Sequence, residues 1–326
     1  MQDTTDPAFT QVPDDLTVEC SQAGGTPASD PQIQAWRGVF AGADVCGSVT
    51  QTDDMPSFFP AGCAPGRATP VTVTLTDWCS LAARETRSVR VEDTTPPYWL
   101  FVPDDLRVEC SAPGGTPASD PQIQAWRASF VSADVCDGAP QRDDMPPFFP
   151  AGCAPGTPTP VTVVAYDDCA QENPATRSVW VQDTTPPVID GVDFDGSCLW
   201  PPNHKYVCIE DVPSHVTAHD VCDPAPRSRI GGCGSDQPDD AKDEDFPGEN
   251  GDGHTVEDCA PSADGLTVCL RSERLGTEPA GRHYTPEVWV LDSCSNSVTA
   301  LPVVYVPHDQ SPAEKECLHP DSPGTK

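Results

Sequence analysis

The residues of this sequence that could do chemistry are aspartates and cysteines that recur in a fixed order. Asp44 and Asp77 each stand two residues before a cysteine, in ADVC and TDWC, and Asp3 opens the phrase DTTDP. Carboxylate oxygens are ligands that calcium accepts, and cysteines can pair as disulfides. No GxSxG, HExxH or glycine-rich phosphate loop accompanies them. We therefore expect a chain that binds ions and is cross-linked, and that is not an enzyme.

The composition narrows the compartment and the partners. The 326 residues include 16 cysteines without zinc-type CxxC pairs, which predicts a disulfide framework formed in an oxidising compartment. The net charge of −33 repels phosphate backbones and anionic lipids. We expect no nucleic-acid partner and no membrane insertion, since no apolar run is long enough to cross a bilayer. Cations and basic surfaces would be attracted, although acidity can also serve only to keep a secreted protein soluble.

The sequence repeats itself at a step of 90 residues. GGTPASDPQIQAWR occurs at Gly24–Arg37 and again at Gly114–Arg127, and the phrases DTTDP, DTTPP and DTTPP begin at Asp3, Asp93 and Asp183. A unit of this length holds a whole domain. A third, divergent copy carries HDVCDP and EVWVLDSCSN, with an acidic insertion at Ser235–Asp258 that could be ordered by ions or be disordered. The predicted boundaries are 1–92, 93–182 and 183–310 for three domains, with a C-terminal tail at 311–326.

Short alternating segments predict the fold class. DLTVEC, TPVTVTLTD and TRSVRVED place β-branched residues on a period of two between turn residues. Several such strands indicate an all-β chain of tandem immunoglobulin-like β-sandwich domains stapled by disulfides. SDPQIQAWR is the exception, because an aspartate before a proline starts a helix. We expect one short helix in each of the first two domains, with Ile33 and Trp36, and likewise Ile123 and Trp126, facing the sandwich.

The ordered phrases DTTPP, VEC, ADVC and VRVEDTTPP resemble the hyalin-repeat (HYR-like) immunoglobulin-fold domains of bacterial surface and secreted proteins. In the third copy, LWPPNHK at Leu199–Lys205 and VPHDQ at Val306–Gln310 are similar to a recurrent bacterial variant of that module. The resemblance covers nearly the whole chain and implies adhesive or scaffold roles outside the cell. One departure is the usual D-x-x-G-N turn, which reads DWCSL, DDCAQ and DSCSN here.

In an immunoglobulin-type sandwich, the start of the first strand and the B–C and F–G loops lie at the same end of the domain. The linker aspartate and the aspartates of ADVC and TDWC would therefore converge, and crowded carboxylates repel one another unless a cation neutralises them. We expect a Ca²⁺ ion there, stiffening the joint to the preceding domain. Alternatively these aspartates cap turns through nearby backbone amides, and both roles can coexist. The candidate ligands are Asp3, Asp44, Asp77, Asp93, Asp134, Asp167, Asp183, Asp220 and Asp292.

The same topology predicts how the cysteines pair, with one bridge at each end of a domain. Four cysteines allow three connectivities, and Cys20–Cys46 with Cys63–Cys79 stays open. Six cysteines are left unassigned, namely Cys198, Cys208, Cys233, Cys259, Cys269 and Cys317. The predicted bridges are Cys46–Cys79, Cys20–Cys63, Cys136–Cys169, Cys110–Cys153 and Cys222–Cys294.

These features together predict a non-enzymatic, secreted or cell-surface structural and adhesive segment, a stalk or fibre of calcium-rigidified repeats. The expected partners are other copies of the chain or components of the cell surface and matrix. The alternative is a non-catalytic accessory or carbohydrate-binding region of a secreted hydrolase. The opening MQDTTDPAFT has no signal-peptide character, and we interpret it as a start methionine on a fragment of a longer protein.

Overall fold

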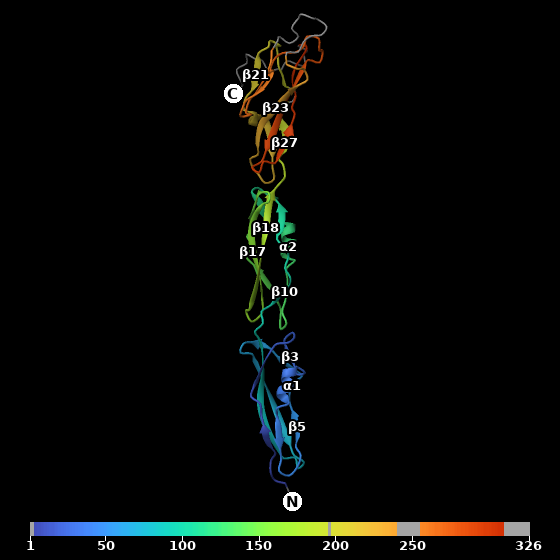
Figure 1. The fold of residues 1–326 in the computed structure, drawn as a ribbon, viewed down its shortest axis with the longest axis vertical. Coiled ribbons are helices and arrows are strands. Elements are labelled where there is room, and N and C mark those ends of the chain that lie inside the picture. The colour runs from blue at the N-terminus through green and yellow to red at the C-terminus, as the bar shows by residue number, and fades with distance from the viewer. Residues whose placement is uncertain (1–2, 195–196, 240–254, 310–326) are drawn as a thin grey trace. The chain divides into compact units, whose positions relative to one another are not determined.

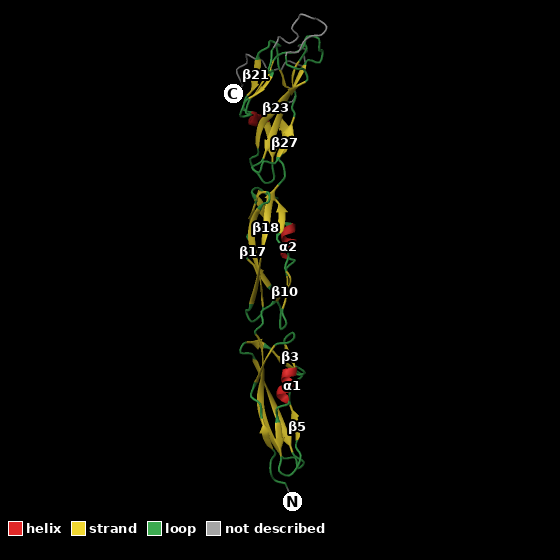
Figure 2. Ribbon diagram, viewed as in Figure 1, coloured by secondary structure: helices red, strands yellow, loops and turns green. Residues whose placement is uncertain are grey.

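Short β-strands dominate the part of the chain that the computed structural model describes, which is residues 3–194, 197–239 and 255–309 (Figure 2). The chain folds as two compact units. The first consists of residues 1–106, 121–146 and 160–178, and so holds the first repeat with part of the second. The second unit consists of residues 107–120, 147–159 and 179–326. The three domain boundaries given above remain a prediction.

The first repeat is built on one main sheet. Its strands follow the order β2-β9-β8-β5, with β7 also paired to β9, while β1 pairs with β4 and β3 with β6. Strands β2 and β7 run parallel to β9, and β8 is antiparallel to it. The elements, labelled in part in Figure 1, are β1 (Ala8–Gln11), β2 (Leu16–Glu19), β3 (Gly25–Pro27), α1 (Pro31–Arg37), β4 (Ala41–Ala43), β5 (Thr50–Asp53), β6 (Phe58–Pro60), β7 (Gly62–Cys63), β8 (Arg67–Thr76) and β9 (Ala82–Asp93).

The core of the first repeat confirms the predicted helix and strands. The Asp30 side chain caps α1 by accepting from the backbone N–H of Gln32 at 2.8 Å, and a proline at the first helical position fixes its φ angle. Ile33 and Trp36 are buried against valines of β8 and β9, and the indole N–H of Trp36 donates to the carbonyl of Asp14. The apolar residues alternate on β8 and β9, so one face of the sheet is apolar and packs into this core.

The second repeat has the same sequence of elements. Strand β12 pairs with β15, β14 with β17 and β16 with β18, as their counterparts do in the first repeat. Ile123 and Trp126 of α2 are buried, as predicted. The elements are β10 (Tyr98–Phe101), β11 (Leu106–Glu109), β12 (Gly115–Pro117), α2 (Pro121–Arg127), β13 (Val131–Ala133), β14 (Gln141–Asp143), β15 (Phe148–Pro150), β16 (Gly152–Cys153), β17 (Thr157–Tyr166) and β18 (Glu172–Asp183).

The third repeat keeps the main sheet, with order β20-β28-β26-β23, and adds a sheet of order β21-β25-β24. The prediction that the acidic insertion is ion-ordered or flexible falls largely on residues 240–254, and the predicted tail on 311–326, both outside the described residues. The elements are β19 (Val188–Val192), β20 (Ser197–Cys198), β21 (Tyr206–Ile209), the 3-10 helix η1 (Val212–His215), β22 (Val216–His219), β23 (Arg227–Ser235), β24 (Cys259–Pro261), β25 (Val268–Arg271), β26 (Arg282–Leu291), β27 (Ser297–Ala300) and β28 (Val304–Val306).

The predicted pairing of the cysteines was wrong, because the bridges join successive repeats. The structure contains Cys20–Cys136, Cys63–Cys169, Cys110–Cys222 and Cys153–Cys294, and Cys46 and Cys79 are free. The third repeat adds Cys208–Cys269 and Cys233–Cys259 within itself, and Cys198 is also disulfide-bonded. None of the predicted bridges Cys46–Cys79, Cys20–Cys63, Cys136–Cys169, Cys110–Cys153 and Cys222–Cys294 is present.

The physical reason lies in the direction of the strands. Cys20 follows β2, and Cys63 ends β7; both strands run parallel to β9 and finish beside its last residues. Both cysteines therefore lie at the C-terminal end of their repeat and face the next repeat rather than each other. Because the prediction treated each repeat as closed, it paired the correct ends with the wrong partners. The connectivity Cys20–Cys46 with Cys63–Cys79 is absent too, since it would join opposite ends of one repeat.

Candidate metal centre at the junctions between repeats

Two disulfides and a set of hydrogen bonds join the first repeat to the second. The backbone N–H of Gly24 donates to the carbonyl of Cys136 at 2.6 Å, beside the Cys20–Cys136 bridge. Glu19, at the end of β2, accepts from the backbone N–H and the hydroxyl of Thr94 at 2.7 and 2.8 Å. The linker after Asp93 is thus fastened to the repeat that precedes it.

The junction between the second and third repeats has the same parts. Glu109 accepts from the backbone N–H and hydroxyl of Thr184 at 2.6 and 2.9 Å, as Glu19 does for Thr94. Gly114 donates to the carbonyl of Cys222 at 2.8 Å. The side-chain amide of Asn296 donates to the carbonyl of Asp183. The whole arrangement is therefore copied along with the sequence.

Carboxylates crowd together where the first junction forms. One ligand atom from each of Asp93, Asp134 and Asp137 lies within 4.8 Å of the others. Burial, followed by the Asp134, Asp137 and Asp167 carboxylates, raises the pKa of Asp93 above its ordinary range. These groups therefore repel one another in a site with little access to water, which is where a cation would be bound most strongly.

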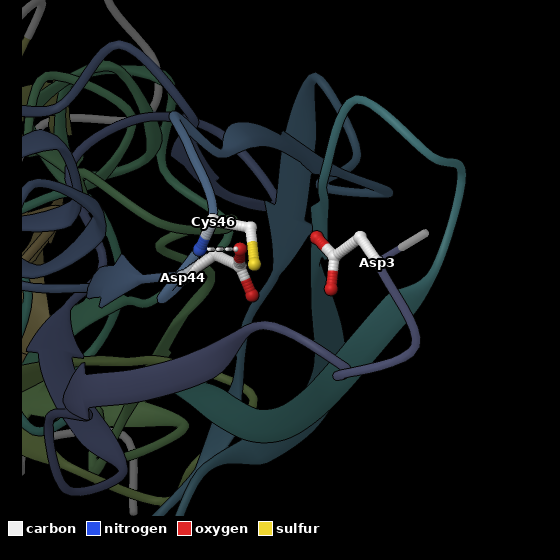
Figure 3. A group of neighbouring side chains, drawn as sticks. All are labelled: Asp3, Asp44 and Cys46. Carbon is white, nitrogen blue, oxygen red and sulfur yellow. Dashed lines mark hydrogen bonds between the residues drawn. The ribbon is translucent and has the colours of Figure 1, made fainter. Parts of the chain in front are cut away.

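The second junction and the N-terminal end of the first repeat hold equivalent groups. Burial, followed by the Asp292 and Asp220 carboxylates, raises the pKa of Asp183 to about 6. At the N-terminal end, Asp3 and Asp44 face the sulfur of Cys46 across a short gap (Figure 3). The nine predicted aspartates are thus gathered into three groups, Asp3/Asp44/Asp77, Asp93/Asp134/Asp167 and Asp183/Asp220/Asp292.

Each of these aspartates uses its two oxygens differently. Asp44 Oδ1 accepts from the backbone N–H of Cys46 at 2.7 Å, and Asp77 Oδ1 accepts from Cys79 and Leu81. This is the turn-capping role. The other oxygen is buried without any hydrogen-bond partner in seven predicted aspartates, and in one that the prediction missed. The atoms are Asp3 Oδ2, Asp44 Oδ2, Asp77 Oδ2, Asp93 Oδ2, Asp137 Oδ1, Asp167 Oδ2, Asp183 Oδ1 and Asp220 Oδ2.

These orphaned oxygens fit a hard cation. A buried, unpaired carboxylate oxygen is costly, and seven of these eight recur at equivalent places in different repeats. Calcium takes six to eight oxygens in a flexible shell, so three or four carboxylates supply part of such a shell. Asp292 differs, because its second oxygen accepts from the Asn296 side chain at 2.7 Å. The capping and metal-binding interpretations are thus compatible, with one oxygen for each.

Sequence reasoning missed several residues of these junctions. Asp137 contributes to the first acidic group, and Asp223 follows the equivalent cysteine in the third repeat, where its carboxylate accepts from Ser293. Both were visible as the extra aspartate in VCDG and VCDP, where the first repeat has Gly47. Glu19 and Glu109 carried a weaker signal, the repeated phrase VEC.

The third repeat also buries a charged cluster beside its own sheet. Arg282 is fully buried and contacts Asp258 at 2.9 Å and Glu273 at 3.1 Å. Thr255 and His204 hydrogen-bond to Glu273 as well. The segments RSER at Arg271–Arg274 and GRHYT at Gly281–Thr285 therefore build an internal ion network, and the pairing of each charge offsets the cost of burying it.

We expect this cluster to make the third repeat less stable as the pH rises from about 4.5 to 7. Burial and the hydrogen bond with Asp258 raise the pKa of Glu273 to about 7, so the folded state holds a proton that the unfolded state releases earlier. The stabilisation from this proton is complete at pH values below the ordinary glutamate pKa. It is lost as the pH rises through the raised pKa of Glu273. Urea unfolding at several pH values, followed by pulse-labelled hydrogen exchange of β25 and β26, measures it. Glu273→Gln should flatten this slope, and exposed Glu278→Gln should keep it; equal slopes in both would contradict the assignment.

No family model matches the chain, and no curated protein matches it. Solved structures of tandem β-sandwich domains do. A protocadherin gammaB4 extracellular domain is similar at 11% identity, with 92% of this chain and 50% of that chain covered and a TM-score of 0.31. Titin domains I67–I69 are 9% identical, with 92% of this chain and 98% of the titin chain covered and a TM-score of 0.31. Drosophila N-cadherin EC1-3 is 13% identical, with 91% of this chain and 99% of that chain covered and a TM-score of 0.29. The chain spans half the length of the protocadherin chain.

At these identities the similarity concerns fold alone. The chain is an all-β protein of tandem immunoglobulin- or cadherin-like domains with two short helices in its first two repeats, and six of its disulfides lie in the described part. Among residues 3–194, 197–239 and 255–309, no helix has the length and apolar character needed to cross a membrane. The resemblance to hyalin repeats remains a prediction.

Proposed function

We propose that this chain is a non-catalytic segment of an extracellular stalk, in which each repeat is locked to the next by two disulfides and by calcium. The observation that carries the proposal is the duplicated double bridge, Cys20–Cys136 with Cys63–Cys169 and Cys110–Cys222 with Cys153–Cys294. A single bridge leaves a joint free to rotate about it. Two bridges at separate points of one junction restrict both bending and twisting.

Calcium would complete the lock at the acidic groups. At the two junctions the linker aspartate, Asp93 or Asp183, is also the residue where one repeat ends and the next begins, so an ion bound there would touch both. Extracellular calcium modules bind at roughly 10⁻⁴–10⁻³ M, which suits a site assembled from carboxylates that keep their turn-capping bonds. The net charge of −33 also disfavours collapse of neighbouring segments onto one another.

A stalk of this kind would bind partners and hold them together, and would not catalyse a reaction on them. The partners we propose are other copies of the chain or components of the cell surface and matrix, and no nucleic acid. Placement outside the cell agrees with the number of disulfides, since such bonds persist in oxidising compartments. An accessory region of a secreted hydrolase would share these traits, but nothing in its role requires a junction locked at two points.

Small-angle X-ray scattering of the full chain tests the proposal. In millimolar calcium the oxidised chain should give one narrow distribution of interatomic distances. Chelation should broaden the distribution, and chelation with a reductant should broaden it further as the joints are freed. Distributions that stay the same under all three conditions would contradict a lock made of disulfides and calcium. A glycan array serves as a second measurement, and specific sugar binding there would favour the carbohydrate-binding alternative.

A further inference from the structure

Two cysteines of the first repeat have no partner although their counterparts do. Cys46 and Cys79 are free. Cys136 and Cys169 stand 90 residues further on, and each is bonded to the repeat that precedes it. The corresponding cysteines of the third repeat, Cys222 and Cys294, are bonded to the second repeat in the same way. Two of the three equivalent ends are therefore closed by two disulfides, and one is not.

The rest of the half-junction is also present at this end. Thr5 donates its backbone N–H to Asp3 Oδ1 at 3.1 Å, as Thr95 does to Asp93 at 3.3 Å. The Cys46 N–H donates to Asp44 at 2.7 Å, the same distance as at Cys136. The linker begins with the same three residues, Asp-Thr-Thr, at all three ends. The backbone here is already shaped as it is where a neighbour is attached.

Exposure shows what a neighbour would cover. One valine precedes the cysteine in each repeat. Its exposed fraction is 43% at Val135 and 48% at Val221, where junctions exist, and 88% at Val45. Trp78, next to Cys79, is 66% exposed. The valine is about half covered in both sister repeats and is largely left in water here, next to a large exposed indole, which indicates a surface built for a partner.

We propose that this open end, made of Asp3, Thr4, Val45, Cys46, Trp78 and Cys79, is an acceptor for one further repeat of the same kind, attached through two disulfides. The attached repeat would present cysteines at the places that Cys20 and Cys63 occupy, and a glutamate at the place of Glu19 to hold Thr4 and Thr5. The proposal concerns thiol connectivity, and it can stand or fall independently of calcium binding and of the stalk.

A second copy of this chain would not supply those cysteines from its described part. Its Cys20, Cys63, Cys110 and Cys153 are already bonded. In the third repeat the residue whose N–H donates to the last strand, as Cys20 donates to Glu92, is Leu199. The third repeat thus has a leucine where the first two repeats have Cys20 and Cys110, the cysteines that bond to the following repeat. The occupant is consequently a repeat of the first or second type.

The bonds form by oxidation of thiol pairs. Each of Cys46 and Cys79 joins one cysteine of the incoming repeat, and each pair of thiols gives up two electrons and two protons. A disulfide oxidant such as oxidised glutathione accepts them and is reduced to two thiols. An oxidising compartment that forms the four inter-repeat bridges supplies this class of oxidant as well.

Peptide mapping tests the proposal in two chains. In the chain as it exists, alkylation without reductant should modify Cys46 and Cys79 and spare the bridged cysteines; a Cys46–Cys79 bridge would overturn the proposal. In an extended chain, a second copy of residues 3–92 is joined directly before Asp3 and oxidised in a glutathione buffer. We expect the added VEC cysteine bonded to Cys46 and the added AGC cysteine bonded to Cys79.

The extended chain has a matched control. When the VEC and AGC cysteines of the added copy are replaced by serine, Cys46 and Cys79 should stay open to alkylation. The circular dichroism spectrum should show that the added repeat keeps its strands. If instead the VEC and AGC cysteines of the unmodified added copy bond to each other, the proposal is wrong.

Discussion

Pulled from its two ends under oxidising conditions, the unfolded chain should extend to roughly a fifth of the length that it reaches after reduction, at about 3.3–3.6 Å per residue. The reason is covalent. The shortest path enters at residue 1, crosses from Cys20 to Cys136, runs to Cys153, crosses to Cys294 and continues to residue 326. Residues 21–135 and 154–293 are bypassed and carry no load.

The expected lengths are far enough apart to measure. The oxidised chain should extend to about 240 Å and the reduced chain to roughly 1,100 Å. Optical-tweezer extension with and without a reductant gives both values on the same molecule. Such a limit on extension is a property that a load-bearing stalk needs, because an unfolded repeat would still hold its two neighbours together.

Two double variants separate this path from a general effect of losing a bridge. Replacing Cys20 and Cys136 by serine forces the path through Cys63–Cys169 and should lengthen the oxidised chain to about 1.6 times its length, at the same length per residue. Removing Cys63–Cys169 should leave the length unchanged, because that bridge is not on the shortest path. If the two variants lengthen the chain equally, the inter-repeat connectivity described here is incorrect.

Local patterns accounted for much of the fold. The alternation in TPVTVTLTD and TRSVRVED sufficed to place β8 and β9, because a sheet with one buried face needs a period of two. The helix at Pro31–Arg37 followed from its cap and its proline, and Ile33 and Trp36 are buried as their spacing requires. The third repeat was harder, because its second sheet, β21-β25-β24, comes from segments that have no counterpart in the first two.

The candidate site was predictable only in part. Topology placed the aspartates of ADVC, TDWC and the linker at one end of each repeat, and the structure gathers them there. Pairing of the cysteines was not predictable in this way, because a repeat of 90 residues contains the same cysteines whether its bridges close within it or reach to the next. Only the parallel pairing of β2 and β7 with β9 places Cys20 and Cys63 at the end of the repeat that faces the next repeat. Asp137 was not predicted because it is not shared by all three repeats: its counterpart in the first repeat is Gly47.

Calcium should raise the thermal unfolding midpoint of the parent chain. When Asp93 and Asp137 are both replaced by asparagine, the variant should be less stable than the parent chain with calcium and more stable than it without calcium. At free calcium of ten to a hundred times the dissociation constant, one site stabilises the folded state by about 1.4–2.7 kcal/mol. The double variant should lose this gain at the first junction. In a chelator, however, it should be more stable than the parent chain, because burial and neighbouring carboxylates raise the pKa of both Asp93 and Asp137, and the neutral amides remove that repulsion.

The crossing of the two effects distinguishes a metal site from a cluster that only caps turns. Asparagine keeps an oxygen for the bonds that Asp93 and Asp137 accept from Thr95 and Asp168, so a capping role alone predicts little change under either condition. Asp14→Asn with Asp104→Asn is the matched control, since both residues are exposed and the change in net charge is equal. Scanning calorimetry in calcium, magnesium and chelator measures all three chains. Calcium that stabilises the site variant as much as the control would exclude binding at the first junction, and magnesium as effective as calcium would argue against a flexible oxygen shell, because the smaller ion demands a stricter geometry.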